Sequence, residues 1–385
     1  MTVVEAIKEL GSRRDLLTDE QYLFLDENGY LALEGLMSSD LIRRLRMQFD
    51  GLIEDEGEQA GAEVHQEEGA NRLANLVDKG EVFEVCISHP KVLAAITEQA
   101  EQLAFAYPGT AHEAKGRCAA KLAEVTPGDL SKVLFTLGGA EAIENAIKIA
   151  RQYTGRHKIV TRYRSYHGAT YGAATAGGDP RRLPNEPGIS GVVRVHDPYA
   201  YRCPFGYAPE GNLQAYIDHV IQTIEFEGPE NVAAILMESI TGSSGLIIPP
   251  DGYWQALREY ADKHGILLIA DEVMSGFGRT GKMFAIEHYN VVPDIMTMAK
   301  ATTNGIVPMG VVAVKEEIYD TIVNASPDGV IELFHGYTYS GIPISVAAGL
   351  AVQEIFEKED IFKRAKEMSP YFQEGLMSLK DLDAV

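Results

Sequence analysis

From about residue 89 onward, short apolar segments alternate with segments of helical periodicity, and few architectures accommodate such an alternation. Helical periodicity is clearest where Ile143, Ala146, Ile147 and Ala150 share one face. Strands that alternate with helices form a mainly parallel sheet with helices on both faces. We therefore predict an α/β fold with strands at 132–136, 158–162, 232–237, 266–270, 295–299 and 310–314.

The residues that follow each expected strand are the first candidates for a functional site, because ligands of such sheets bind at the carboxyl ends of the strands. Gly138 and Gly139 follow the strand at 132–136 and precede a helix. Glycine lets the backbone approach a ligand, and the unpaired N–H groups at a helix N-terminus favour an anion such as phosphate. A plain strand-to-helix connection is the alternative for this turn alone.

An aromatic residue follows the next expected strand. Tyr166 lies in the run Ser165-Tyr166-His167-Gly168, shortly after the strand at 158–162. A ring at this edge of the sheet is suited to stacking on a flat cofactor, and a half-buried core tyrosine is the alternative.

Two adjacent carboxylates, Asp271 and Glu272, end the apolar run at 266–270. A carboxylate at the end of a buried strand requires a cationic partner. A protonated pyridine nitrogen is such a partner, because the carboxylate keeps the ring protonated and the ring then withdraws electrons. A metal ion is the alternative, although no histidine-rich spacing accompanies the pair.

A lysine follows the strand expected at 295–299. Lys300 precedes a polar loop that contains glycine. A lysine among apolar neighbours becomes a nucleophile toward a carbonyl, whereas a solvated surface lysine is the ordinary alternative. The spacing from Asp271 to Lys300 accommodates one helix-bearing crossover, so we expect both side chains at the same edge of the sheet.

Composition and charge exclude several classes of protein. The formal net charge of −22 disfavours binding to nucleic acid and to anionic membranes. The N-terminal residues lack the pattern of a signal peptide, and no apolar stretch is long enough to span a bilayer. The three widely spaced cysteines suggest neither a disulfide framework nor a zinc cluster. We expect a cytoplasmic enzyme.

Residues from about 89 to 385 resemble the class III (omega-type, fold-type I) aminotransferases, which use pyridoxal 5′-phosphate (PLP). The resemblance rests on Leu268-Ile269-Ala270-Asp271-Glu272-Val273, on the runs at 275–281 and 334–341, and on Lys300 with residues 305 and 308–310. It implies a PLP-binding large domain at 89–335, with a mainly parallel seven-stranded sheet in an α/β/α arrangement. It also implies that 336–385 begin a truncated C-terminal small domain.

The resemblance further implies which residues bind the cofactor. Gly139 and Ala140 are expected to bind the PLP phosphate through their backbone N–H groups. Tyr166 is expected to stack on the ring, with His167 beside it. Thr338 is expected to reach the phosphate of a neighbouring subunit, which implies a homodimer or a higher homo-oligomer.

The resemblance assigns the chemistry to four further residues. Asp271 is expected to pair with the pyridine nitrogen, and Val273 to pack on the other face of the ring. Lys300 is expected to form the Schiff base and to act as acid and base. Glu238 matches the active-site glutamate of the family.

The resemblance is greatest to the taurine and β-alanine transaminases, from residues 164–168 and 197–199. Ser243 stands where some members have a gating glutamate, which favours omega-amino donors. The implied reaction moves an amino group from an amine or omega-amino acid to a 2-oxo acid such as pyruvate or 2-oxoglutarate. Another PLP reaction, such as that of an aminomutase or a decarboxylase, is the alternative.

Residues 1–88 form a separate N-terminal segment, expected to be small and helical or α+β. Residues 18–88 resemble the start of a phytanoyl-CoA dioxygenase, through the runs at 24–35 and 75–80. His65 and Glu67 have the short spacing of iron ligands, but they lie in a glycine- and glutamate-rich run, so we expect no metal there. A fused or truncated PLP-binding protein with impaired turnover therefore stays an alternative, and an iron dioxygenase is the least favoured one.

Overall fold

The computed structural model describes residues 39–56, 90–206 and 212–378, and it divides the chain into two units, Met1–Ala94 and Ala95–Val385. In the first unit, the structure describes helix α3 (Ser39–Glu56). His65, Glu67 and the dioxygenase-like runs at 24–35 and 75–80 lie outside the described residues. Helix α5 (Pro90–Leu103) crosses the boundary between the units.

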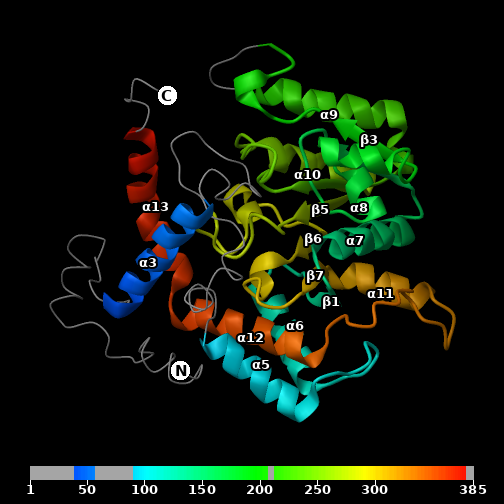
Figure 1. The fold of residues 1–385 in the computed structure, drawn as a ribbon. Coiled ribbons are helices and arrows are strands. Elements are labelled where there is room, and N and C mark those ends of the chain that lie inside the picture. Colours follow the sequence, from blue (N-terminus) through cyan, green and yellow to red (C-terminus); the bar gives the residue numbers. More distant parts are fainter. Residues whose placement is uncertain (1–38, 57–89, 207–211, 379–385) are drawn as a thin grey trace. The chain divides into compact units, whose positions relative to one another are not determined.

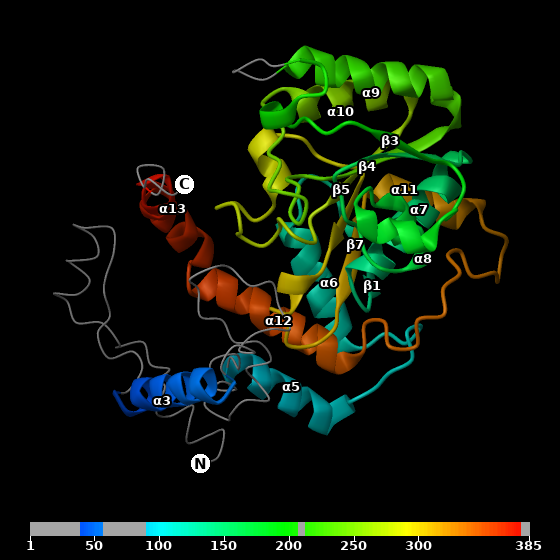
Figure 2. The ribbon, with the colours of Figure 1, turned by 45° about the horizontal axis from the view of Figure 1, so that its top comes forward.

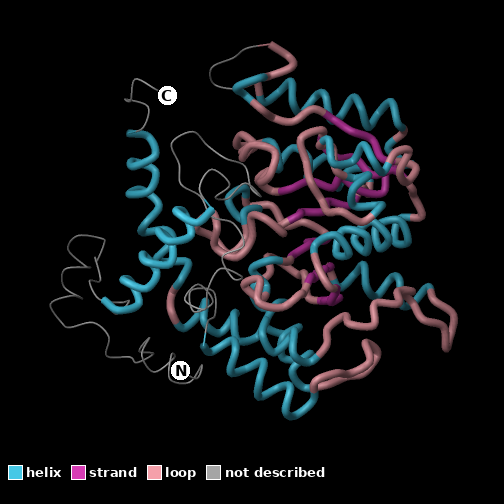
Figure 3. Tube along the Cα trace, viewed as in Figure 1, coloured by secondary structure: helices cyan, strands magenta, loops and turns pink. Residues whose placement is uncertain are grey.

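A seven-stranded sheet forms the centre of the described part of the second unit (Figure 3). The strand order is β1-β7-β6-β5-β4-β2-β3. Only β7 is antiparallel to its neighbours in this sheet, and the other pairs are parallel. The strands are β1 (Lys132–Thr136), β2 (Lys158–Arg162), β3 (Val192–Val195), β4 (Val232–Glu238), β5 (Leu267–Asp271), β6 (Ile295–Met298) and β7 (Gly310–Val314). The predicted mainly parallel α/β fold is therefore confirmed.

Helices cover both faces of the sheet (Figures 1 and 2). Helix α7 (Gly139–Thr154) packs across β1 and β4–β7 on one face, and α9 (Leu213–Glu227) and α10 (Tyr253–His264) pack on the other. Alternation along β4 explains this arrangement, because successive side chains of a strand point to opposite faces. Leu236 belongs to the core cluster that contains α7, whereas Ile235 and Met237 belong to the cluster that contains α9 and α10.

The connecting elements complete the layers. Gly265 ends α10 in the left-handed region with φ 61°, and its N–H donates to the carbonyl of Ala261, so it caps the helix. None of the described helices is both long and apolar enough to cross a membrane. The remaining elements are α6 (Glu113–Val125), α8 (Tyr171–Ala176), α11 (Glu316–Ala325), α12 (Pro343–Lys358), α13 (Ile361–Ser378), and the 3-10 helices η3 (Pro180–Asn185), η4 (Ala200–Arg202), η5 (Pro229–Asn231), η6 (Ala285–Tyr289) and η7 (Lys300–Thr302).

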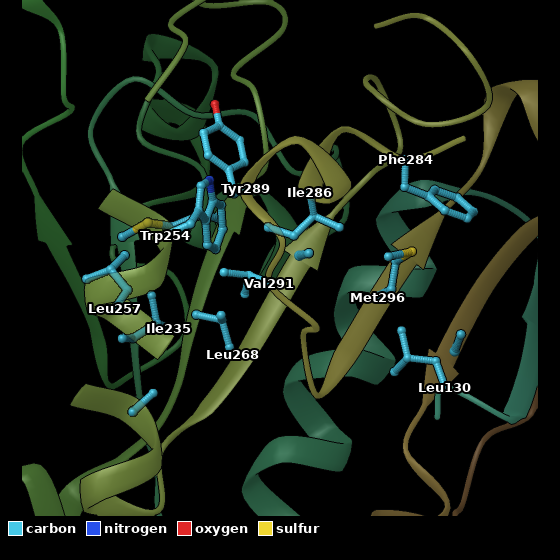
Figure 4. Packing of buried hydrophobic residues seen from close by; sticks show 14 of the residues in the cluster. Leu130, Ile235, Trp254, Leu257, Leu268, Phe284, Ile286, Tyr289, Val291 and Met296 are labelled. Atoms are coloured by element: carbon cyan, nitrogen blue, oxygen red, sulfur yellow. The ribbon is translucent and has the colours of Figure 1, made fainter. Parts of the chain in front are cut away.

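A buried aromatic pair supports the end of β4 (Figure 4). The indole N–H of Trp254 donates to the carbonyl of Ser239 at 3.2 Å, and the hydroxyl of Tyr289 donates to the carbonyl of Pro249 at 3.1 Å. Both rings are buried, with their centroids 6.4 Å apart. Their polar atoms are thus satisfied, so the pair contributes apolar area without leaving an unpaired donor.

The carboxyl ends of the central parallel strands meet at one edge. The register pairs Glu238 with Asp271, and Asp271 with Thr297. The crossover from β5 to β6 contains only the 3-10 helix η6 in its fully described residues 272–294, not the α-helix that the spacing suggested. The expected placement of Asp271 and Lys300 at one edge is confirmed, since only Ala299 separates Lys300 from the end of β6 and both residues line one cavity.

We expect Gly310→Ala to destabilise this edge, because a Cβ at Gly310 would overlap the carbonyl of Gly138 and the hydroxyl of Thr136. Overpacking of this kind costs about 1–3 kcal/mol. Gly138→Ala is the matched control, because a Cβ there meets nothing within 4 Å and φ is −173°. Urea unfolding of both variants measures the difference, and equal stabilities would contradict the account of this contact.

Candidate active site

A cavity of about 630 Å³ lies at the carboxyl ends of the central strands. With one exception, the predicted site residues line it together: Gly139, Ala140, Tyr166, His167, Glu238, Asp271, Val273 and Lys300. The exception is Thr338, which is exposed and is not among the residues that line the cavity. Its predicted reach into a neighbouring subunit stays a prediction.

The turn from β1 into α7 forms one end of the cavity. The first helical hydrogen bond is from the N–H of Ala142 to the carbonyl of Gly138, at 3.0 Å. The N–H groups of Gly139 and Ala140 therefore precede the helical hydrogen-bond ladder, where donors have no intrahelical partner. Gly168 packs so closely on Ala140 that a Cβ at Gly168 would overlap it. The loop that contains Tyr166 is thus fitted against the turn.

The carboxylate of Asp271 lies deeper in the cavity, with only 3% of the residue exposed. Its Oδ2 is 2.7 Å from Nδ1 of His167. Its Oδ1 accepts from the N–H of Val273 at 3.0 Å and from the hydroxyl of Thr297 at 3.2 Å. Among the described residues, His167 is its only ion-pair partner, so a cationic ligand atom would complete a carboxylate that is otherwise costly to bury.

Glu238 at the end of β4 is also buried. Its Oε1 accepts from the N–H of Tyr166 at 3.1 Å, and its Oε2 accepts from the N–H of Gly242 at 2.8 Å. Burial raises the pKa of the Glu238 carboxyl and the negative charge of Asp271 adds to this, while His167 is the first of the groups that oppose it. Glu238 thus fixes the backbone of Tyr166 from the neighbouring strand.

Behind Glu238 lies a buried cation that the sequence analysis missed. Arg162 at the end of β2 is fully buried, and its Nη2 donates to the carbonyl of Glu238 at 2.5 Å. Its Nε lies 3.9 Å from Oδ1 of Asp197. Burial raises the pKa of Asp197, and the charge of Arg162 opposes the shift. The hydrogen bond to Glu238 ties the end of β2 to the end of β4, and the ion pair with Asp197 ties it to the residues after β3.

Lys300 lies in the cavity in an unusual backbone conformation. Its φ is 47°, in the left-handed region that L-residues rarely adopt, and such outliers concentrate at functional sites. Its carbonyl accepts from the N–H of Gly305 at 3.0 Å, which closes the loop. Of the two environments considered for Lys300, the structure shows the solvated one, because the residue is exposed.

The adjacent Glu272 faces a different environment from Asp271. Its Oε1 accepts from the hydroxyl of Ser239 and the N–H of Ile286, at 2.6 and 2.8 Å. Its Oε2 accepts from the hydroxyl of Ser275 and the N–H of Ala285, at 2.6 and 3.1 Å. Four donors occupy both oxygens, which disfavours the alternative of a metal ion shared with Asp271. Glu272 instead holds the loop at η6 against the sheet.

The cavity also contains residues to which the sequence analysis assigned no role. Arg181, Met274 and Thr303 belong to this group. Arg181 lies in η3, a short element between α8 and β3 without apolar periodicity, so no local pattern indicated that it faces the cavity.

The comparisons with known proteins identify the family. The sequence model of the class-III aminotransferases matches residues 55–385. The chain therefore belongs to the class-III aminotransferase family, as its motifs predicted, and the cofactor of this family is PLP. The match begins before the expected boundary near residue 89 and overlaps the segment at 18–88. The resemblance of that segment to a dioxygenase stays a prediction.

Two curated relatives and one solved structure illustrate the similarity. An omega-aminotransferase of Caulobacter vibrioides is 38% identical, over 76% of this chain and 68% of its own length. A β-alanine–pyruvate aminotransferase of Pseudomonas aeruginosa is 36% identical, over 76% of this chain and 67% of its own. The structure of a taurine:2-oxoglutarate aminotransferase of Bifidobacterium kashiwanohense, in complex with PLP and glutamate, has 42% identity and a TM-score of 0.71, over 76% of this chain and 65% of its own. The chain thus spans about two thirds of the length of these relatives.

The cavity fits PLP on the chemistry of its donors. Backbone N–H groups at the start of α7 suit a phosphate, and the buried carboxylate of Asp271 suits a protonated ring nitrogen. Nε2 of His167 is buried and has no hydrogen-bond partner among the described residues. The side chain of Val273 lies so near Gly139 that a Cβ there would be 2.9 Å from it, so only glycine leaves this wall of the cavity in place.

We expect Glu272→Ala to destabilise the protein by about 2–4 kcal/mol, because it leaves buried donors from Ser239, Ser275 and η6 without an acceptor. Glu287→Ala is the matched control on the same loop, since Glu287 accepts from the N–H of Phe284 and is only partly buried. Denaturant unfolding compares the two, and a loss for Glu272→Ala no larger than the loss for Glu287→Ala would refute the role of Glu272.

The raised pKa of Glu238 predicts a pH-dependent stability. The folded protein holds the Glu238 proton to higher pH than the unfolded chain, so this contribution is fully present below about 4.5 and is lost as pH rises through the folded pKa. Relative to Glu238→Gln, the wild type should therefore become less stable as pH rises above 4.5. Unfolding of the cofactor-free proteins across this window measures the difference, and a pH-independent offset would contradict it.

Proposed function

We propose that this chain is a PLP-dependent transaminase, which moves an amino group from an amine or omega-amino acid to a 2-oxo acid such as pyruvate or 2-oxoglutarate. The family membership and the named relatives support the reaction type. The observation that carries the proposal is one cavity that contains Asp271 at the end of β5 and Lys300 at the start of η7, two residues after the end of β6.

When bound, PLP supplies an aldehyde that takes up the amino group and a protonated ring that withdraws electrons from the reacting carbon. In our proposal, the N–H groups of Gly139 and Ala140 bind the phosphate. Asp271 holds the proton on the ring nitrogen, and His167 and Thr297 hold the Asp271 carboxylate in place. Val273 and Tyr166 bound the two faces of the ring.

Lys300 would hold the cofactor through its side-chain amine, and its Nζ would accept and return the proton at the reacting carbon. Its position after β6, one strand from Asp271, supports this role. Glu238 positions Tyr166 through the backbone N–H. Because Lys300 is exposed here, we also propose that a second copy of the chain, with Thr338 contributing from it, covers the site in a homodimer.

We further propose taurine- or β-alanine-like amine donors. A β-alanine–pyruvate aminotransferase among the relatives and a taurine:2-oxoglutarate aminotransferase among the similar structures support this substrate class. A screen of amine donors against pyruvate and 2-oxoglutarate tests it. Turnover restricted to α-amino acids would overturn the donor class without affecting the cofactor.

We expect the purified protein to bind PLP with a visible absorbance band that borohydride abolishes irreversibly. Lys300→Ala should lose the reducible adduct, because no amine remains at that position. Lys263→Ala is the control, since Lys263 is an exposed residue of α10 outside the cavity. Absorbance spectra recorded before and after reduction test this expectation. A reducible band that persists in Lys300→Ala would refute the assignment of Lys300 as the residue that binds PLP covalently.

A further inference from the structure

The cavity contains few charged side chains. Those that line it are the anionic Glu238 and Asp271 and the cationic Lys300 and Arg181. In the proposed function the amine of Lys300 takes part in the chemistry, so it is not available to hold a substrate by its charge. Among the described residues that line the cavity, Arg181 is then the cation that has no role in the proposed function.

The guanidinium of Arg181 is fixed by its own local structure. Asp179 caps η3, and its Oδ1 accepts from the N–H of Arg181 at 2.9 Å. Its Oδ2 accepts from Nε of Arg181 at 2.9 Å and also from Nη2. These hydrogen bonds to Asp179 fix the orientation of the guanidinium in the absence of a ligand, so less conformational entropy is lost when an anion binds.

Two further contacts direct the guanidinium into the cavity. It lies over the ring of Tyr166, 3.7 Å from the centroid, and its Nη2 is 3.2 Å from the hydroxyl oxygen of Ser243. Both partners line the cavity. Nη1 has no hydrogen-bond partner among the described residues, so its two N–H groups are free to donate to a ligand beside Tyr166.

Asp179 neutralises part of the charge of Arg181, but it does not remove the directed donors. A carboxylate or sulfonate can accept from the two free N–H groups of Nη1, whereas a neutral amine offers no anionic acceptor. Ser243 adds a hydroxyl at the same place without adding a negative charge. The local chemistry therefore favours a substrate with an anionic group at the end remote from its amine.

We propose that Arg181 is a specificity-determining residue that binds the carboxylate or sulfonate of the amine donor. This inference rests on the proposed function for the identity of the reaction, and it adds the residue that selects acidic donors. The proposed contact with the substrate is formed by η3 and by the loop after β4, both in the large domain.

The kinetic test compares an acidic donor with a neutral one in the PLP-loaded protein. For Arg181→Met, KM for β-alanine or taurine should rise about tenfold or more, as expected for a lost charge-assisted hydrogen bond. KM and kcat for propylamine should stay near the wild-type values, and Arg181→Lys should recover part of the loss. Arg182→Met is the matched control, because Arg182 pairs with Glu186 and does not line the cavity. An equal loss for acidic and neutral donors would overturn the proposal in favour of a structural role.

A binding test separates this inference from the proposed function. Propionate and ethanesulfonate lack the amino group, so their binding to the PLP-loaded protein, measured by titration calorimetry, needs no turnover. Binding should be weakened about tenfold or more in Arg181→Met and retained in Arg182→Met. Binding that depends on Arg181 in a protein without transaminase activity would leave the inference standing and reject the proposed function. Transaminase turnover together with unchanged binding of propionate and ethanesulfonate in Arg181→Met would leave the proposed function standing and reject the inference.

Ser243→Glu provides a second variant should Arg181→Met fail to fold. A glutamate beside Arg181 supplies a competing carboxylate, so acidic donors and propionate should bind more weakly while propylamine is unaffected or favoured. Unchanged binding of propionate in this variant would count against the proposal.

Discussion

The buried carboxylate of Asp271 is the constraint on which this edge of the fold depends. An ionised group with 3% exposure is tolerated only when hydrogen bonds and opposite charge compensate for the lost water. The compensating groups come from three places: the loop after β2, the turn after β5 and the strand β6. These segments must therefore meet at one point, and the space they leave in front of the carboxylate is the cavity.

The neighbouring buried charges show how the fold satisfies this demand. The carboxylate of Glu272 accepts four hydrogen bonds and has a structural role. The carboxylate of Glu238 accepts only two hydrogen bonds and lines the cavity. Arg162 lies behind Glu238, and its Nε and Nη1 have no hydrogen-bond partner among the described residues. Polar groups that are not fully satisfied concentrate at functional sites, where proteins depart from the rule that buried donors are paired.

Much of this arrangement was predictable from sequence because it is local. β1, β2 and β7 have the predicted bounds, since each contains a short apolar run. β3 was missed because four residues with Arg194 among them give no periodic signal. Asp271 and Lys300 were identifiable because one ends a strand and the other lies just after a strand, each in a recognisable motif.

The remaining features arise from tertiary contacts. Arg162 and Arg181 acquire their roles only when loops distant in sequence come together, and neither lies in a pattern that indicates those partners. The exposure of Lys300 likewise depends on what surrounds the loop after β6, which a strand pattern does not report. Local chemistry in the sequence thus predicts which groups react, whereas the groups that orient them and select the substrate require the folded chain.

The protonation state of the ring nitrogen tests the central claim most directly. Protein loaded with PLP that is labelled with ¹⁵N in the pyridine ring reports that state through its nitrogen chemical shift. If Asp271 faces the ring nitrogen, the wild type should show a protonated nitrogen at neutral pH, and Asp271→Asn should show an unprotonated one. A nitrogen that is unprotonated in the wild type, or a shift that the substitution leaves unchanged, would contradict the account.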